Sequence, residues 1–156
     1  MQRIHERKTI LCMKHDYKII IGIDPGSSTG LAVWNVTSQK LTEVSTLSIH
    51  AALDRVKELQ EIGKVFVRYE DASKRTWFGK FSPDTDRARL QGAGSIKRDC
   101  AIWKEFLNDY MIDHEPVAPR HIRTKMKSEP FNQLTGWQGR TTSHGRDAAM
   151  MVFKFG

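Results

Sequence analysis

The sequence predicts an α/β domain, a five-stranded mixed sheet flanked by helices. Short apolar runs rich in β-branched residues, such as Ile19-Ile20-Ile21-Gly22-Ile23, are bounded by turn residues, which is typical of strands. Longer segments between these runs repeat apolar residues at helical spacing. Strands and helices that succeed one another in this way build a sheet with helices on its faces. A chain of 156 residues is long enough for one domain with a sizeable core and too short for two lobes.

Three consecutive strands are expected in the first part of the domain. Residues 18–24 form an apolar run that ends at Asp24, where Pro25-Gly26 terminates the strand. A second strand over 30–36 runs back along the first, and a third strand follows over 41–49. Asp24 is therefore expected at the edge of the sheet, with its carboxylate fixed in place.

The later elements alternate between helix and strand. A helix starts at Ile49 and stops at Gly63, because apolar residues recur between them at helical spacing and glycine ends helices. The fourth strand, over 65–70, again ends in an acid, Glu70. The rest is expected as a polar loop over 72–85, a long helix over 96–112 whose start is broken by Gly92 and Gly94, a strand over 116–122, a loop with a helical turn over 131–137 and a helix over 143–155.

Composition narrows the classes of partner and compartment. Lys and Arg total 25 against 18 Asp and Glu, a net charge of +7, which favours a polyanionic partner such as nucleic acid. No apolar stretch approaches the roughly 20 residues of a membrane helix. Residues 1–16 lack the apolar core of a signal peptide and are expected to form a disordered extension before the domain at 17–156, with Met13 as an alternative start. Two distant cysteines fit a reducing, cytoplasmic compartment and exclude a Cys-rich zinc site.

Four polar residues on three elements are candidates for a metal site. Asp24 and Glu70 end two strands that can be neighbours, and His144 and Asp147 share one helix face beside its apolar stripe. Singly, each has a structural explanation: a turn-forming Asp, an acid at a loop mouth or a favourable charge in a first helical turn. Jointly they favour a site for Mg²⁺ or Mn²⁺, which prefer oxygen-rich ligands.

Three motifs identify a family resemblance. Ile21-Gly22-Ile23-Asp24-Pro25-Gly26, Val67-Arg68-Tyr69-Glu70-Asp71 and His144-Gly145-Arg146-Asp147-Ala148-Ala149 resemble, in this order, the RuvC-type Holliday junction resolvases of the RNase H-like superfamily, particularly the phage-encoded branch. The resemblance covers residues 18–155. It implies that Asp24, Glu70, His144 and Asp147 bind two Mg²⁺ ions, with Mn²⁺ able to substitute. It further implies a homodimeric endonuclease that hydrolyses phosphodiesters at four-way DNA junctions in recombination or phage DNA processing, within the cytoplasm of a bacterial host if phage-encoded.

The sequence departs from the family pattern at two positions. Many members carry Asp where His144 stands, and a neutral imidazole lowers the negative charge of the site and favours Mn²⁺. Asp71 adds a carboxylate that the pattern does not require, and Glu70 is preferred over it because Glu70 ends the apolar strand. The family also places a lysine near the scissile phosphate. Lys125 is the candidate for this catalytic role and Lys127 for a DNA contact, although the sequence does not choose between them.

Basic and aromatic residues are candidates for DNA binding. The loop after the second acid interleaves cations with aromatic rings, which can stack on bases left unpaired at a junction. Further cations near the start of the long helix are placed to contact phosphates. The alternatives are that the aromatics pack beneath the loop and that the cations form a solvated face. The candidates are Lys74, Arg75, Trp77, Phe78, Arg87, Arg89, Lys97 and Arg98.

Three other functions compete with this interpretation. The turn Asp24-Pro25-Gly26-Ser27-Ser28-Thr29-Gly30 also resembles the first phosphate loop of actin-like kinases, but the chain has neither a second lobe nor a second phosphate loop, so no nucleotide cofactor is expected. A non-catalytic junction-binding protein would tolerate loss of an acid, whereas all four positions are filled. An RNase H acting on RNA–DNA hybrids, or a less selective branched-DNA nuclease, stays open.

Overall fold

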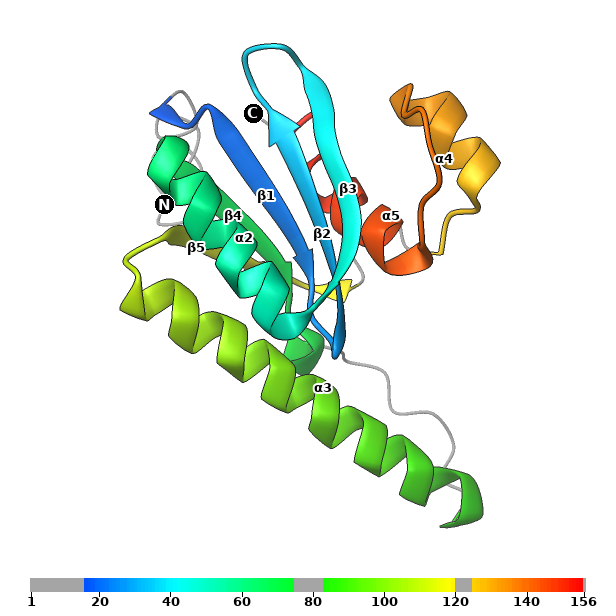
Figure 1. Ribbon diagram of the computed structural model, residues 1–156. Helices are drawn as coiled ribbons and strands as arrows, with labels where there is room; N and C mark the ends of the chain where they lie inside the picture. The colour runs from blue at the N-terminus through cyan, green and yellow to red at the C-terminus, as the bar shows by residue number, and fades with distance from the viewer. Residues whose placement is uncertain (1–15, 75–82, 120–124, 156) are drawn as a thin grey trace, which may run out of the picture.

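The structure is a five-stranded mixed sheet flanked by helices, as predicted (Figure 1). This computed structural model describes residues 16–74, 83–119 and 125–155, with backbone alone for 83–90. The strand order is β3-β2-β1-β4-β5. The first three strands form an antiparallel meander, and β4 and β5 run parallel to β1. Their bounds are β1 Ile19–Asp24, β2 Ser28–Asn35, β3 Lys40–Ser48, β4 Val65–Glu70 and β5 Asp113–Val117.

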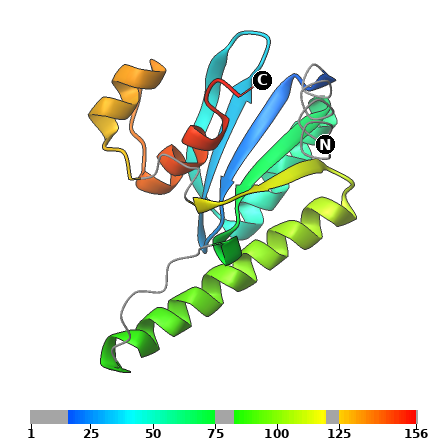
Figure 2. The same cartoon turned by 180° about the vertical axis from the view of Figure 1, so that it is seen from behind.

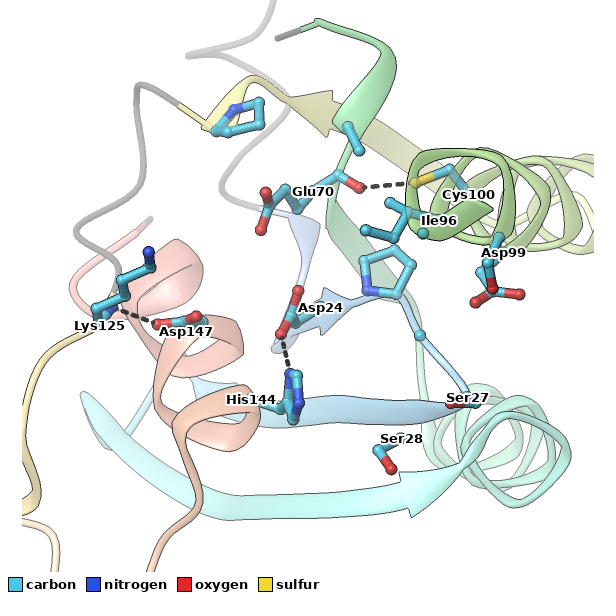
Figure 3. Close-up of a pocket in the computed structure, with 16 residues that line it drawn as sticks. Asp24, Ser27, Ser28, Glu70, Ile96, Asp99, Cys100, Lys125, His144 and Asp147 are labelled. Atoms are coloured by element: carbon cyan, nitrogen blue, oxygen red, sulfur yellow. Dashed lines mark hydrogen bonds and ion pairs between the residues drawn. The ribbon is translucent and has the colours of Figure 1, made fainter. Parts of the chain in front are cut away.

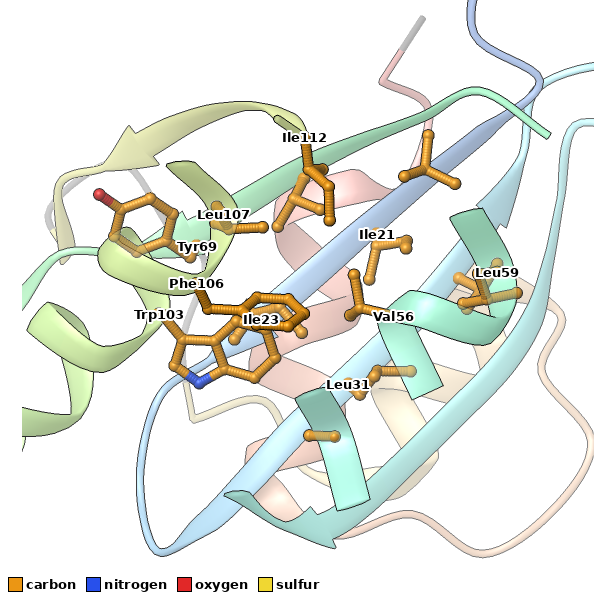
Figure 4. Packing of buried hydrophobic residues seen from close by; sticks show 14 residues of the cluster. Ile21, Ile23, Leu31, Val56, Leu59, Tyr69, Trp103, Phe106, Leu107 and Ile112 are labelled. Carbon is orange, nitrogen blue, oxygen red and sulfur yellow. The ribbon is translucent and has the colours of Figure 1, made fainter. Parts of the chain in front are cut away.

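Helices cover both faces of the sheet. On one face lie α2 and α3, and on the other lies α5, as the two opposite views show (Figures 1 and 2). Before Asp24, the strand β1 is apolar, as expected for a strand covered on both faces. Ile21 and Ile23 belong to the core under α2 and α3 (Figure 4). Ile20 belongs to the core under α5. The helices are α2 Ile49–Ile62, η2 Ala72–Lys74, α3 Pro83–Asp109, α4 Ser128–Thr135 and α5 Ser143–Val152.

The helix α3 starts thirteen residues before the position expected from the sequence. Gly92 and Gly94 lie inside it and do not break it, which corrects that prediction. Its C-terminal half packs on the sheet through Trp103 and Leu107, both fully buried, whereas its N-terminal half extends beyond the sheet (Figures 1 and 2). Residues 91–95 of this helix are exposed, and an exposed segment shows no apolar periodicity, so the sequence pattern detected only the packed part.

The strand β5 also differs from its prediction. It covers Asp113–Val117 in place of 116–122 and pairs with β4 alone, as an edge strand. An edge strand can be polar and can hold a proline such as Pro116, so its sequence carries little strand signal. The segment expected as a loop with one turn is the helix α4, which ends at Gly136 in the left-handed conformation with φ 72°. The last helix, α5, ends at Val152, before Phe155.

The apolar face of α3 belongs to the chain's own core. Trp103, Phe106 and Leu107 pack with residues of β1, β4 and α2 (Figure 4). A homodimer with its two-fold axis near the helix over 96–110, as the resemblance led us to expect, could therefore not use these buried side chains for its contact. Tyr110 and Met111, at the end of the helix, are exposed. Within the described ranges, no helix combines the length and apolar character needed to cross a membrane.

Candidate active site

Asp24 and Glu70 end two neighbouring parallel strands. In the register of β1 and β4, Ile23 pairs with Tyr69, so the next residue of each strand is an acid. Neighbouring strands lie about 4.8 Å apart, which brings the two carboxylates to the same edge of the sheet. Glu70 is buried, with 7% of its surface exposed. The expected placement of both acids on adjacent strands is confirmed.

Two glycines let α5 lie directly on the sheet beside these acids. A Cβ atom at Gly30 of β2 would overlap the carbonyl oxygen of His144, and one at Gly22 of β1 would overlap that of Ala148. The close approach lets His144 and Asp147, one helical turn apart, line the same pocket as Asp24. The helix begins there because the Thr142 hydroxyl accepts a hydrogen bond from the amide of Gly145, at 3.1 Å.

Asp24 is held in a partly desolvated environment. Its side chain is 14% exposed, and its Oδ2 lies 2.8 Å from Nδ1 of His144, whose side chain is 51% exposed. Burial raises the pKa of Asp24, and the negative charge of Asp147 raises it further; hydrogen bonds with His144 and Glu70 and the charge of His144 oppose this shift. A carboxylate whose ionised form is disfavoured in this way gains from any cation that enters the pocket.

Lys125 is fixed at the pocket by its backbone. Its amide donates to Oδ1 of Asp147 at 2.9 Å, and its φ of 59° is in the left-handed region. Next to it, the guanidinium of Arg146 donates to the carbonyl oxygen of Met126 at 2.6 Å. Two successive residues of α5 thus hold two successive residues of the incoming chain. Lys125 lines the pocket, whereas Lys127 is the N-cap residue of α4 and does not.

The pocket that these residues share has a volume of about 490 Å³ (Figure 3). Figure 3 shows Asp24 at its centre, Glu70 above, His144 below and Asp147 with Lys125 on one side. As they stand, no three His, Cys, Asp or Glu side chains of the described residues close around a common point where an ion would sit. The donor set nevertheless fits Mg²⁺ or Mn²⁺, since it offers carboxylate oxygens, one imidazole and no thiolate on the polar side of the pocket.

The other predicted residues fall into three groups. Asp71 lies outside the pocket and accepts hydrogen bonds from the amide and hydroxyl of Ser73, so it stabilises η2, and Glu70 is the acid that lines the pocket. Lys74 ends η2, and Lys97 and Arg98 are exposed on α3. Arg98 pairs with Asp99 at 3.0 Å. The residues Arg75, Trp77 and Phe78 lie outside the described residues, as do the side chains of Arg87 and Arg89.

Sequence reasoning missed three contributors to the site. Arg146 lies between the two candidate ligands of α5 and holds residues 126, 128 and 141 through its guanidinium. Asp99 and Cys100 of α3 line the far wall of the pocket. The thiol of Cys100 donates to the carbonyl oxygen of Glu70 at 3.4 Å, which fixes α3 to the end of β4. Asp99 and Cys100 lie inside the segment that the sequence predicts as a helix, but no sequence pattern places that helix beside the acids.

Comparisons with known proteins assign no family to the chain. No family model matches it, and no curated protein matches it. The function proposed below therefore depends on the residues and geometry of the chain itself.

Replacing Asp24 with Asn is expected to stabilise the protein when no divalent cation is present. The raised pKa means that the folded state disfavours the ionised carboxylate, so Asp24 lowers stability at neutral pH. This loss of stability disappears as the pH falls below the ordinary pKa of an Asp side chain, about 3.9. Asn keeps an oxygen for His144 without the charge. Thermal unfolding at pH 7 should show a higher midpoint for the variant, by about 2–4 °C per kcal/mol gained.

The exposed Asp54 of α2 provides the control for this prediction. Its carboxylate lies 3.7 Å from the amine of Lys57 at the surface, so Asp54→Asn should leave the midpoint nearly unchanged. Added Mg²⁺ should stabilise the unaltered protein and the control more than Asp24→Asn, because binding to the folded state adds stability. A lower thermal midpoint for Asp24→Asn at pH 7 would show that the carboxylate of Asp24 stabilises the fold.

Proposed function

We propose that this protein is a divalent-cation-dependent endonuclease that cleaves phosphodiesters in branched DNA, with four-way junctions as its main substrate. One observation carries the proposal: Asp24 and Glu70 end adjacent parallel strands, and Asp147 and His144 of α5 line the same pocket. A net charge of +7 supports a polyanionic substrate. The sheet order and the motif resemblance support an RNase H-like, RuvC-type assignment.

Asp24, Glu70 and Asp147 are proposed to hold two Mg²⁺ ions, with His144 as the fourth ligand and Mn²⁺ as an accepted substitute. When bound, such ions polarise the phosphoryl oxygens, activate a water and stabilise the leaving oxygen. The carboxylates of the chain supply the negative charge that makes this binding favourable in a partly buried pocket. The raised pKa of Asp24 adds to the gain, since a cation relieves the repulsion from Asp147.

The protein's own groups position the phosphate and manage protons. When Nδ1 of His144 donates to Oδ2 of Asp24, Nε2 carries the lone pair and can bind a cation or accept a proton. Lys125 lines the pocket, and its ammonium is proposed to supply positive charge for the scissile phosphate. Because its backbone is tied to Asp147, the position of Lys125 follows that of a proposed ligand.

A homodimer follows from the proposed substrate. A four-way junction offers two symmetric strands to cut, and a two-fold symmetric protein offers one site for each. Sedimentation with and without junction DNA tests this part separately, and a monomer in both conditions would contradict it.

The decisive experiment compares substrates of equal length under identical conditions. A four-way junction, a flap, an RNA–DNA hybrid and a linear duplex are each incubated with Mg²⁺, with Mn²⁺ or with EDTA. We expect cleavage of the junction in both metals, slower cleavage of the flap and none in EDTA. Preferential cleavage of the hybrid would favour an RNase H, equal cleavage of flap and junction a less selective nuclease, and binding without cleavage in either metal an architectural protein.

A further inference from the structure

Arg146 of α5 binds the chain on both sides of α4. Its guanidinium donates through Nε to the carbonyl oxygen of Met126, at 2.6 Å. Through Nη1 it donates to the hydroxyl of Ser128 at 3.0 Å, and to the carbonyl oxygen and the hydroxyl of Thr141 at 2.8 and 3.0 Å. Residues 126–128 lead into α4, and Thr141 lies between α4 and α5. One guanidinium therefore closes both ends of the segment that carries α4.

The four acceptors of this half-buried guanidinium are neutral oxygens. Arg55, Arg68 and Arg98, in contrast, each pair with a carboxylate. The planar guanidinium directs its donors in fixed directions, so the groups that accept from it are fixed relative to one another. The hydrogen bonds of Arg146 therefore set the position of two chain segments on α5, beside the candidate ligands that flank it.

Lys125, which lines the pocket, comes directly before the segment that Arg146 holds. Its backbone has a φ of 59°, and its amide donates to Oδ1 of Asp147 at 2.9 Å (Figure 3). A residue other than glycine is disfavoured in the left-handed region and persists there where surrounding contacts hold it. On the C-terminal side of Lys125, such a contact is the hydrogen bond from Arg146 to Met126.

We infer that Arg146 is a positioning residue, which holds the backbone of Lys125 so that its ammonium lies beside the scissile phosphate. The inference rests on the proposed nuclease function, which gives Lys125 that role. A lysine has a flexible four-carbon stem, so the protein controls the place of its ammonium mainly through the backbone. Asp147, the other support of Lys125, is itself a proposed cation ligand. The hydrogen bonds of Arg146 involve no proposed ligand, so this support does not depend on bound cations.

Native-state hydrogen exchange tests the positioning without a substrate. In Arg146→Lys the charge is kept, but one ammonium replaces separate donors and cannot serve the acceptors on both sides of α4. We expect the amide of Lys125 to exchange about tenfold faster or more, relative to the amide of Ile21 in the buried central strand. Arg68→Lys is the matched control, because Arg68 also donates to a carbonyl oxygen of α5, that of Met151. It should leave this ratio unchanged, and an unchanged ratio in Arg146→Lys overturns the inference.

A double-mutant cycle then tests whether Arg146 acts through Lys125. Single-turnover cleavage of a four-way junction in Mg²⁺ is measured per folded molecule for Arg146→Lys, for Lys125→Ala and for the double variant. We expect Arg146→Lys alone to cleave about 100-fold more slowly, because a small misplacement of a group at the reacting phosphate has an effect of this size. Added to Lys125→Ala, it should cause no further loss, since the side chain that it positions is already absent.

The possible results separate the inference from the proposed function. Losses that multiply in the double variant overturn the inference and leave the nuclease function intact, whereas no cleavage of any junction by the unaltered protein overturns both. If Arg146→Lys does not fold, Ser128→Ala replaces it, because this variant removes one acceptor at an exposed residue. It should speed up exchange of the Lys125 amide several-fold and slow cleavage only in proteins that keep Lys125. Unchanged exchange in Ser128→Ala would then overturn the inference.

Discussion

Asp147→Asn is expected to reduce cleavage of a four-way junction by about 10³-fold or more, with junction binding nearly unchanged. The Oδ1 atom of Asp147 accepts a hydrogen bond from the backbone amide of Lys125, and the side-chain oxygen of an asparagine can accept the same hydrogen bond. The substitution therefore removes charge and preserves the local structure. Metal-assisted stabilisation of the transition state is worth several kcal/mol, and each 1.36 kcal/mol is tenfold in rate. Single-turnover cleavage in Mg²⁺ measures the loss.

The binding half of this prediction has a separate cause. Affinity for DNA comes mostly from phosphate contacts by Lys and Arg, which Asp147→Asn leaves in place. Binding is measured in EDTA, where no variant cleaves. Asp71→Asn is the matched control, because Asp71 is also an acid after β4 but lies outside the pocket and stabilises η2. Its turnover should stay near that of the unaltered protein. Equal turnover of Asp147→Asn and Asp71→Asn would mean that the acids of the pocket are structural.

The sequence predicted the sheet and its acids well because both are encoded locally. An apolar run covered on two faces, ended by an acid and Pro-Gly, is visible without knowledge of the fold, as for Ile19–Asp24. The helix α5 was equally visible, since its buried residues recur on one face. The parallel pairing of β1 with β4 then follows from the helix that connects β3 to β4 and covers one face of the sheet.

The far wall of the pocket, which Asp99 and Cys100 line, could not be predicted because a contact between distant segments leaves no pattern in the sequence. Residues 91–95 of α3 are exposed, so their helical state does not follow from apolar spacing, and no sequence pattern places Asp99 beside the acids. The choice between Lys125 and Lys127 depends on a left-handed residue and a backbone hydrogen bond to Asp147, neither of which a sequence pattern specifies. Such details arise only once distant segments meet.

Gly30→Ala is expected to lower the free energy of unfolding by about 3 kcal/mol or more. The added methyl group would overlap the carbonyl oxygen of His144, a backbone atom of α5 that cannot move aside alone. Relief requires the first turn of α5 to shift away from β2, which carries His144 and Asp147 away from Asp24. Cleavage should therefore fall even in the fraction that stays folded. Urea denaturation and single-turnover cleavage at low temperature measure the two effects.

Gly94→Ala separates this steric effect from the general properties of glycine. A Cβ atom at Gly94 would meet nothing within 4 Å, and the residue lies inside α3, so alanine should stabilise the protein by about 0.5–1 kcal/mol. Gly22→Ala should resemble Gly30→Ala in stability, because its methyl group would overlap the carbonyl oxygen of Ala148. Its effect on cleavage should be smaller, since Ala148 lies beyond the two candidate ligands. An equal urea midpoint for Gly30→Ala and the unaltered protein would show that α5 does not lie this close to β2. The proposed site of Asp24, Glu70, His144 and Asp147 would then lose its geometric basis.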